Sequence, residues 1–323
     1  MSIQRENIQK QGKCADKKYV TNLRRFAKDV KRDRNLLLIL LPGVLYFIIF
    51  KYIPMGGIVI AFKDYNVYKG ILGSNWNDFA YFKDFFGDFM FWRLFRNTIL
   101  LGLYTILWGF PIPIIFALLL NEVKNVRYKR SIQTISYLPH FISTVIVVGM
   151  VLDFLSPSTG IINRIITLFG GEPISFMVKN AWFRTVYVTT GIWQATGWNA
   201  IIYLAAITNV DVSLYDAAKI DGAGRFKQVL KITIPSIIPT ITVLFILRIG
   251  GILENEFEKV LLMQNPAIYE TADVLDTFIY RRGIESADFG YATAVGLAKS
   301  IVALCMLTGA NFVSRKLTDN SLW

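Results

Sequence analysis

The stretch VDVSLYDAAKIDGAGRFKQVLKITIPSIIPT, residues 210–240, is a polar, charged island between two long apolar runs. Ser213 and Asp216 have the spacing of a helix capping box, so a short helix is predicted over residues 214–220. Gly222 then predicts a turn, because glycine readily adopts the left-handed backbone conformation that ends many helices. A second helix is predicted from about Gly224. The island therefore reads as two helices joined by a glycine elbow.

Three interpretations of this island compete. It is a structured loop, a helix-turn-helix that reads DNA, or a docking element for a cytoplasmic protein. Ala217 and Ala218 favour docking, because their small side chains let another surface approach the backbone closely. A DNA reader is disfavoured because the second helix runs directly into an apolar segment and cannot enter a groove.

The composition indicates a membrane protein. Of the 323 residues, 54% are hydrophobic and 18% are charged. In soluble domains about a quarter of all residues are charged. The net charge of +12 lies in segments that flank apolar runs, which argues against nucleic acid as a partner. Cys14 and Cys305 lie in a polar tail and an apolar run, so they do not predict a disulfide framework.

Six apolar segments approach the roughly 20 residues that a membrane-spanning helix needs. The predicted fold class is therefore all-α, a polytopic membrane protein with six transmembrane helices. The C-terminal end of the first segment is ambiguous and falls between residues 50 and 62. The predicted spans are residues 36–50, 98–120, 135–155, 186–208, 234–253 and 292–313.

Lysine and arginine residues predict the orientation, because they concentrate on the cytoplasmic side of spans. They are frequent in the tail 1–35, in the connections after the second and fourth spans, and in the tail 315–323. Six spans place all four segments on one side, so both termini are expected to be cytoplasmic. The first apolar segment starts too far from Met1 for a cleavable signal peptide and is expected to be retained.

Polar residues within the spans are candidates for a solute path. Aromatic rings and amides suit a sugar, which has apolar faces and a polar rim. The alternative is packing between helices, which Gly191 and Gly197 would permit in the fourth span. The two charged candidates are expected either to attract an acidic sugar or to form structural pairs. For Arg248 the structural alternatives are a side chain that extends toward the membrane interface or a pair with Glu254 or Glu256. The six candidates are Trp193, Gln194, Trp198, Asn199, Arg248 and Lys299.

The segment DAAKIDGAGRFKQVLKITIP, residues 216–235, resembles the EAA loop of ABC-importer permeases. That pattern is E-A-A, three residues, Gly, nine residues, then I-x-L-P. This chain has Asp216-Ala217-Ala218, Gly222 and residues 232–235 at the same spacing, with Asp216 for Glu and Ile234 for Leu. The DGAGRF variant is similar to the carbohydrate-uptake branch. Further segments resemble its polysaccharide and complex-sugar permeases: LPGVLYFIIFKYIPMGGIVIAFKDY, YLPHFIS, GWNAIIYLAAI, NPAIYETADVLDTFIYRRG and YATAVGLAKS.

The resemblance implies a type I importer permease in the bacterial plasma membrane, with a permease domain at 36–314 and the coupling loop at 210–235. The short helix is then the coupling helix, held by a cytoplasmic ATPase through Asp216, Ala217, Ala218, Gly222 and Arg225. The implied partners are a second homologous permease subunit in a heterodimer, two ABC ATPase subunits, an extracellular or periplasmic substrate-binding protein, a sugar, and membrane lipid.

The sequence contains no phosphate-binding loop and no zinc-ligand spacing. We therefore expect no catalytic site and no bound cofactor, with ATP and Mg used by the partner ATPase. His140 is expected to be structural. Two alternative functions stay open: a permease of the same superfamily for peptides or phosphate, and a membrane sensor or assembly protein that does not transport.

Overall fold

The computed structural model describes residues 32–318. Most of the predicted tail 1–35, with Cys14, and the last five residues of the tail 315–323 lie outside this range. The chain divides into two units, Met1–Val59 and Ile60–Trp323.

A long apolar helix makes up the described part of the first unit. It runs from Arg34 to Phe62, just beyond the unit boundary, so it continues past Lys51 and is long enough to cross a bilayer. Leu38 and Ile39 are 63% and 78% exposed, which suits a helix that faces lipid. Its parts are α2 (Arg34–Phe47), the π-helical turn η1 (Ile48–Tyr52), α3 (Ile53–Met55) and the 3₁₀ segment η2 (Gly56–Phe62).

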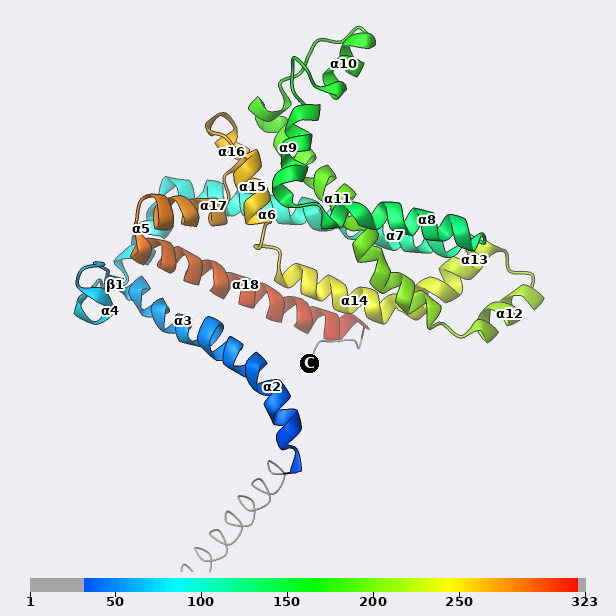
Figure 1. The fold of residues 1–323 in the computed structure, drawn as a ribbon, viewed down its shortest axis with the longest axis horizontal. Helices are drawn as coiled ribbons and strands as arrows, with labels where there is room; N and C mark the ends of the chain where they lie inside the picture. The colour runs from blue at the N-terminus through cyan, green and yellow to red at the C-terminus, as the bar shows by residue number, and fades with distance from the viewer. Residues whose placement is uncertain (1–31, 319–323) are drawn as a thin grey trace, which may run out of the picture. The chain divides into compact units, whose positions relative to one another are not determined.

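The second unit is mostly helical, which confirms the predicted fold class (Figure 1). Its described residues also form a small two-stranded antiparallel sheet, in which Lys63 lies opposite Trp76. Its elements up to α11 are β1 (Lys63–Asp64), α4 (Gly70–Gly73), β2 (Asn75–Trp76), α5 (Ala80–Gly87), α6 (Phe89–Gly109), α7 (Pro111–Asn121), α8 (Val126–Tyr137), η3 (Leu138–Phe141), α9 (Thr144–Phe154), α10 (Ile161–Leu168), η4 (Phe176–Val178) and α11 (Asn180–Thr208). The others are α12 (Val212–Ile220), α13 (Arg225–Gln228), η5 (Val229–Thr233), α14 (Ile234–Gly250), α15 (Phe257–Met263), η6 (Pro266–Ile268), α16 (Tyr269–Ala272), α17 (Leu275–Tyr280), η7 (Arg281–Glu285) and α18 (Phe289–Thr318).

Three of the predicted spans of this unit are continuous helical runs that exceed the predicted lengths. They are Phe89–Asn121, Arg225–Gly250 and Phe289–Lys316. The run at Arg225 starts nine residues before the predicted span, because α13, η5 and α14 join without a break. Pro235 lies in the first turn of α14, directly after the π-helical turn η5, and Pro239 lies inside α14.

The third predicted span is not one straight helix. Residues 135–155 include Pro139, and the chain bends by 99° between Val126–Phe141 and Thr144–Phe154. The bend follows because Pro139 lies in the first turn of the 3₁₀ segment Leu138–Phe141 and Ile142 after it is extended. The fourth span, Asn180–Thr208, is followed by α12 at 69°. Counting each bent pair as one span gives six, which is compatible with the predicted number.

Three hydrophobic clusters hold the second unit together. The first joins α6, α9, α11 and the α15–α17 segment around Phe183 and Tyr187. The second joins α7, α11 and α14 around Tyr203 and Ile237. The third joins α5, α6, α17 and α18 around Phe85. Because α11 contributes to two of the three clusters, it is the central helix of the unit.

Two glycines permit close helix contacts. A Cβ atom on Gly197 of α11 would overlap the backbone carbonyl oxygen of Ser136 in α8. One on Gly102 of α6 would overlap the carbonyl oxygen of Ile252. This supports the packing interpretation of Gly197, since only a hydrogen fits there.

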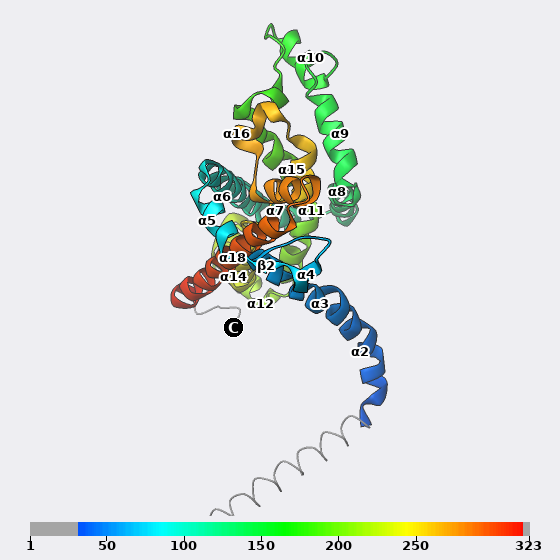
Figure 2. The same ribbon diagram turned by 90° about the vertical axis from the view of Figure 1, so that its left-hand side faces the viewer.

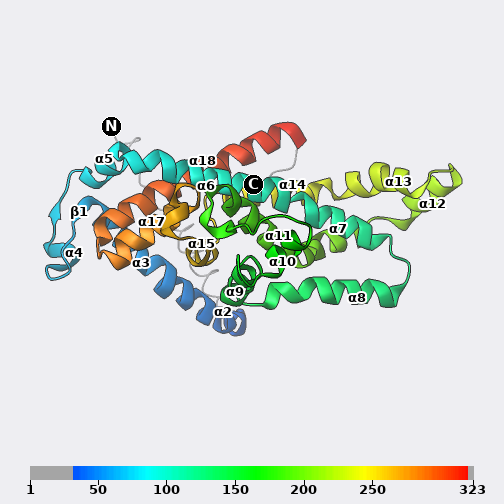
Figure 3. The same ribbon diagram turned by 90° about the horizontal axis from the view of Figure 1, so that it is seen from above.

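The second unit projects at two places. The segment with α9 and α10 reaches away from the other helices (Figure 2). Asn163 stabilises this projecting segment. Its side-chain amide donates to the carbonyls of Leu155, Ser156 and Ile174 at 3.0–3.1 Å. The hairpin of α12 and α13 forms the end of the unit opposite α5 and α17 (Figure 3).

Candidate functional site

The α12 helix of the hairpin is capped differently from the sequence prediction. Asp211 is the N-cap residue, and its carboxylate accepts a hydrogen bond from the backbone N–H of Ser213 at 2.9 Å. The helix therefore starts at Val212, and the predicted Ser213–Asp216 capping box is wrong. Asp211 is favoured because its carboxylate reaches the free N–H groups of the first turn. Hydrogen bonds from Ser213 hold the pKa of Asp211 below its usual value, so this cap is lost only as the pH falls through that lowered value.

Asp216 lies in the middle of α12 rather than at its N-terminus. Its carboxylate accepts a bond from Lys219 Nζ at 2.8 Å, and both side chains are 62% exposed. Ala217 is exposed and Ala218 is partly exposed next to it. An exposed pair like Asp216–Lys219 contributes little to stability, so the Asp216 carboxylate can exchange Lys219 for another partner at little cost.

Gly222 makes the elbow between the two helices, as predicted. Its φ is +73°, in the left-handed region that favours glycine. Ala223 N–H donates to the carbonyl of Ala218 at 2.8 Å, which closes the end of α12. The side chain of Gln228 then donates to the carbonyl of Ala223 at 2.8 Å.

A hydrogen bond joins α12 to the helix that enters the bundle. The Tyr215 hydroxyl lies 2.9 Å from the hydroxyl of Thr233, a residue that is 1% exposed at the end of η5. Arg225 also lies 3.9 Å from Glu122 at the end of α7, but both are well exposed and this contact is weak. The elbow is thus linked to α14 through Tyr215. A displacement of α12 would therefore move Thr233 through this hydrogen bond.

The hairpin exposes several apolar side chains. Val212 is 67%, Ile220 87% and Phe226 77% exposed. Apolar side chains grouped on a polar, basic loop are typical of a surface that another protein covers.

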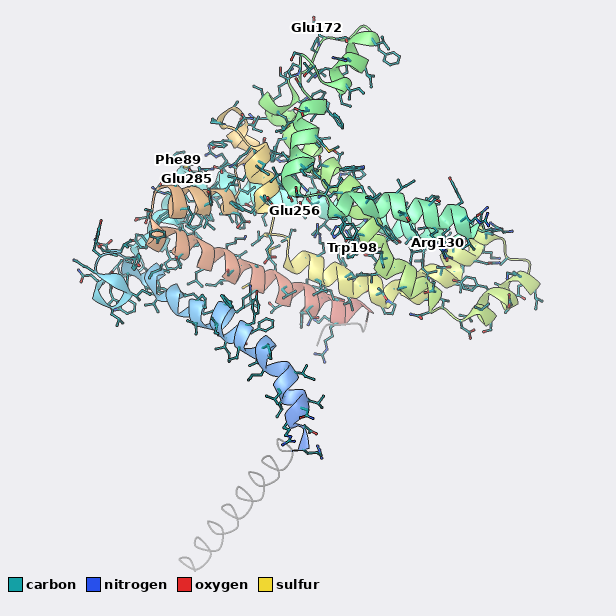
Figure 4. All side chains as sticks on the ribbon, viewed as in Figure 1. Phe89, Arg130, Glu172, Trp198, Glu256 and Glu285 are labelled. Carbon is teal, nitrogen blue, oxygen red and sulfur yellow. The ribbon has the colours of Figure 1, made fainter. Side chains whose placement is uncertain are left out.

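The candidate residues of α11 fall on two sides of that helix. Trp193 lines a cavity of about 350 Å³ with α9, and the Gln194 amide donates to the carbonyl of Ile142 at 3.1 Å. Trp198, labelled in Figure 4, stacks on His140 with a centroid distance of 4.5 Å. These three side chains therefore contact α9 and the turn before it, and one face of Trp198 is already covered.

Asn199 faces another side of α11, where it meets Arg248 of α14. Both residues line two small cavities that also share Gly109 of α6. The other charged groups at this place are Glu256 and Lys259. Lys299 lies in α18, where its ammonium group pairs with Asp276 at 2.5 Å, as the structural-pair interpretation expects.

Lys259 was not among the sequence candidates. It is 1% exposed, its ammonium group lies 2.5 Å from Glu256 Oε2, and it lies 4.6 Å from the centroid of the Tyr187 ring. The backbone N–H of Glu256 donates to the Tyr187 hydroxyl at 3.1 Å. The signal for this pair was the three-residue spacing of Glu256 and Lys259, which places two opposite charges on one side of a turn.

Arg248 differs from Lys259 in its partners. Neither Glu254 nor Glu256 forms an ion pair with it, so the predicted structural pair of Arg248 is wrong. The α14 helix ends at Gly250, and Glu256 is turned toward Lys259 instead. Within residues 32–318, Arg248 forms no hydrogen bond or ion pair, and the same residues contain no group of three His, Cys, Asp or Glu that could hold a metal ion.

Comparison with known proteins gives a family match over most of the chain. Residues 85–319 match the model of the binding-protein-dependent transport system inner membrane component family. The matched region includes α12, the Gly222 elbow and the cavities along α11.

Two curated proteins of Bacillus subtilis (strain 168) are similar to this chain over nearly its full length. Protein LplB is 49% identical and is aligned over 91% of this chain and 92% of its own length. The polygalacturonan/rhamnogalacturonan transport system permease protein YteP is 45% identical over 90% of this chain and 91% of its own length.

Two solved structures have a similar fold. One is a bacterial ABC transporter involved in the import of the acidic polysaccharide alginate, with a TM-score of 0.85 and 44% identity over 91% of this chain and 99% of the other. The second is a bacterial alginate ABC transporter in complex with an alginate pentasaccharide-bound periplasmic protein, with a TM-score of 0.84 and 43% identity over the same shares.

Proposed function

This chain belongs to the binding-protein-dependent transport system inner membrane component family, and we propose that it is the permease subunit through which an ATP-driven importer takes up oligosaccharides or polysaccharide fragments. The support for the solute class is that YteP is named for polygalacturonan and rhamnogalacturonan, and that a similar structure is of an alginate importer. These relatives favour a saccharide over the alternatives of peptides, phosphate or a non-transporting role.

The proposed importer has four further kinds of component. A second, homologous permease subunit completes the path, since six spans enclose too little space for a sugar alone. Two cytoplasmic ATPase subunits bind and hydrolyse ATP with Mg, and this chain binds no cofactor. A substrate-binding protein delivers the saccharide from outside, which the periplasmic protein in a similar complex supports. Both termini lie in the cytoplasm of a bacterial cell.

The observation that carries the proposal is the α12–Gly222–α13 hairpin. Its exposed apolar side chains, with Ala217 and Ala218, form a surface for a cleft of the ATPase. Closure of the ATPase dimer moves α12 as a rigid body. The Tyr215–Thr233 bond and the unbroken run from α13 into α14 carry this movement to the spans. The spans then alternate between two packings around the saccharide path.

Cross-linking from Ala217 tests this coupling role. In a variant with Cys14 and Cys305 replaced by serine, Ala217→Cys is expected to cross-link to the ATPase in the assembled importer, because α12 lies in its cleft. The matched control is Glu172→Cys, on the opposite projection, which is expected to give no ATPase adduct. An importer that takes up a saccharide yet never yields the Ala217 adduct would contradict the docking of α12.

A further inference from the structure

We propose that the groove where α6, α11 and α14 meet binds the carboxylate groups of an acidic saccharide, with Arg248 as its anion-binding residue and the Glu256–Lys259 pair beside it. This inference rests on the proposed function and assigns the chemical class of the solute within it. It concerns the charged residues of this chain, which no comparison assigns.

Three neighbouring cavities follow α11. Two of them share Gly109, Asn199 and Arg248 among their lining residues. The one that also contains Glu256 and Lys259 shares Val188 and Ile192 with a third cavity of about 570 Å³, toward the start of α11. Cavities that share lining residues along one side of this helix are a suitable place for a chain of sugar units.

The charges within the groove leave one positive charge without a counter-ion. Lys259 and Glu256 neutralise each other at 2.5 Å, whereas Arg248 has no ion-pair partner among the described residues. Glu256 lies in the connection between α14 and α15, beside α11 (Figure 4). Arg248 is exposed in this chain and lines both cavities, so its guanidinium is accessible to an anion there. One carboxylate from the solute would provide that anion.

A second cation lies nearer the start of α11. Arg184 lines the 570 Å³ cavity, and one of its terminal nitrogens donates to Asn97 Oδ1 at 3.0 Å. Its Nε atom is buried and has no hydrogen-bond partner in residues 32–318. Arg184 and Asn199 are separated by about 22 Å along the helix axis, at a rise of 1.5 Å per residue. Because Asn199 and Arg248 line the same cavity, positive groups are present at two levels along α11.

The groove also discriminates against neutral saccharides. Asn199 offers an amide to sugar hydroxyls, and the hydroxyls of Thr105 and Thr196 line the same space. These groups can form hydrogen bonds with the hydroxyls of any saccharide, whether neutral or acidic. A neutral sugar would nevertheless displace water from Arg248 without offering a negative charge, and an uncompensated charge of this kind opposes binding.

The test uses the complete importer in proteoliposomes, with its partner permease, ATPase and binding protein. Uptake of a galacturonic acid trimer is compared with uptake of an arabinose trimer, which is neutral. Arg248→Gln is expected to lower galacturonate uptake by about tenfold or more, the effect of losing a hydrogen bond to a charged group. Arg248→Lys is expected to retain most of it, because the charge stays in the groove.

Glu256→Gln is expected to change galacturonate uptake in the opposite direction from Arg248→Gln. It removes the carboxylate that competes for Lys259 but keeps an oxygen acceptor, so the concentration of galacturonate trimer at half-maximal uptake is expected to fall. A merely structural groove would lose activity in both variants. The matched control is Arg315→Gln at the end of α18, which removes one exposed positive charge and is expected to leave uptake unchanged.

Three results would overturn the inference while the proposed function stands. The first is uptake of the arabinose trimer with no uptake of the galacturonate trimer. The second is galacturonate uptake that Arg248→Gln leaves at the wild-type rate. The third is galacturonate uptake that Glu256→Gln lowers as much as Arg248→Gln does in an assembled complex. An importer that takes up no saccharide of either kind would overturn the proposed function as well.

Discussion

At the scale of single residues, Gly222 shows how one backbone conformation determines the shape of a loop. Its φ of +73° is strained for any residue with a side chain, yet a Cβ atom there would touch nothing within 4 Å. The requirement for glycine is therefore conformational rather than steric. Gly224, two residues later, has a φ of −64° and is equally free of neighbours, so it carries no such requirement.

We predict that Gly222→Val lowers ATP-driven uptake while the complex still assembles. The left-handed conformation costs a residue with a side chain about 1–2 kcal/mol, so α12 is displaced relative to α13. Gly224→Ala is the matched control and is expected to retain uptake, since alanine adopts its φ without strain. Both are measured in the proteoliposome assay. Equal uptake by Gly222→Val and wild type would show that the elbow angle does not matter.

At the scale of helices, α11 is the element on which the others depend. It contributes to two hydrophobic clusters, contacts α8 through Gly197, and presents Asn199 to the groove. The faces of this helix make different contacts. The face with Gln194 and Trp198 contacts Ile142 and His140 of the bent third span, and another face lines the groove. Of the four candidates in α11, only Asn199 meets the charged residues.

We predict that Gly197→Ala destabilises the protein, because the added methyl group overlaps the Ser136 carbonyl and α8 must move away. Overpacking of this kind costs about 1–3 kcal/mol, so the Tm of the purified protein in detergent should fall by several degrees. The matched control is Gly149→Ala in α9, where a Cβ atom meets nothing within 4 Å. A Tm for Gly197→Ala no lower than that of the control would contradict the close contact.

At the scale of the whole molecule, the charge distribution and the arrangement of the second unit indicate the same orientation in the membrane. Arg130 lies on α8 and Glu172 at the tip of the segment beyond α9, far from each other (Figure 4). The positive-inside rule assigns Arg130 to the cytoplasm, and one crossing then places Glu172 outside.

We predict that a membrane-impermeant maleimide labels Glu172→Cys in intact cells and labels Arg130→Cys only after the cells are opened. Both side chains are exposed, so access depends on the side of the membrane. The native Cys14 and Cys305 are replaced by serine in both variants, and the variant without an added cysteine is the background control. Labelling of Arg130→Cys in intact cells would reverse the proposed orientation.

The amino-acid sequence was enough to predict the helical membrane fold and the glycine elbow of the hairpin, and the six predicted spans are compatible with the structure. Each of these depends on local composition or on spacing within a few residues, and such patterns are readable along the chain. Where local signals competed, prediction was less accurate: Asp211 displaced Ser213 as the cap, and Pro139 broke a span whose composition alone predicted a straight helix.

Tertiary structure decided which polar residues meet. Asn199 and Arg248 come from α11 and α14, and they meet the Glu256–Lys259 pair only when these helices are packed against α15. Lys299 has the same chemistry as Lys259 but pairs with Asp276, and Trp198 is covered by His140. The pairing of Glu256 with Lys259 follows from their local spacing, but burial and contacts between helices depend on packing, and no pattern along a single helix reports those.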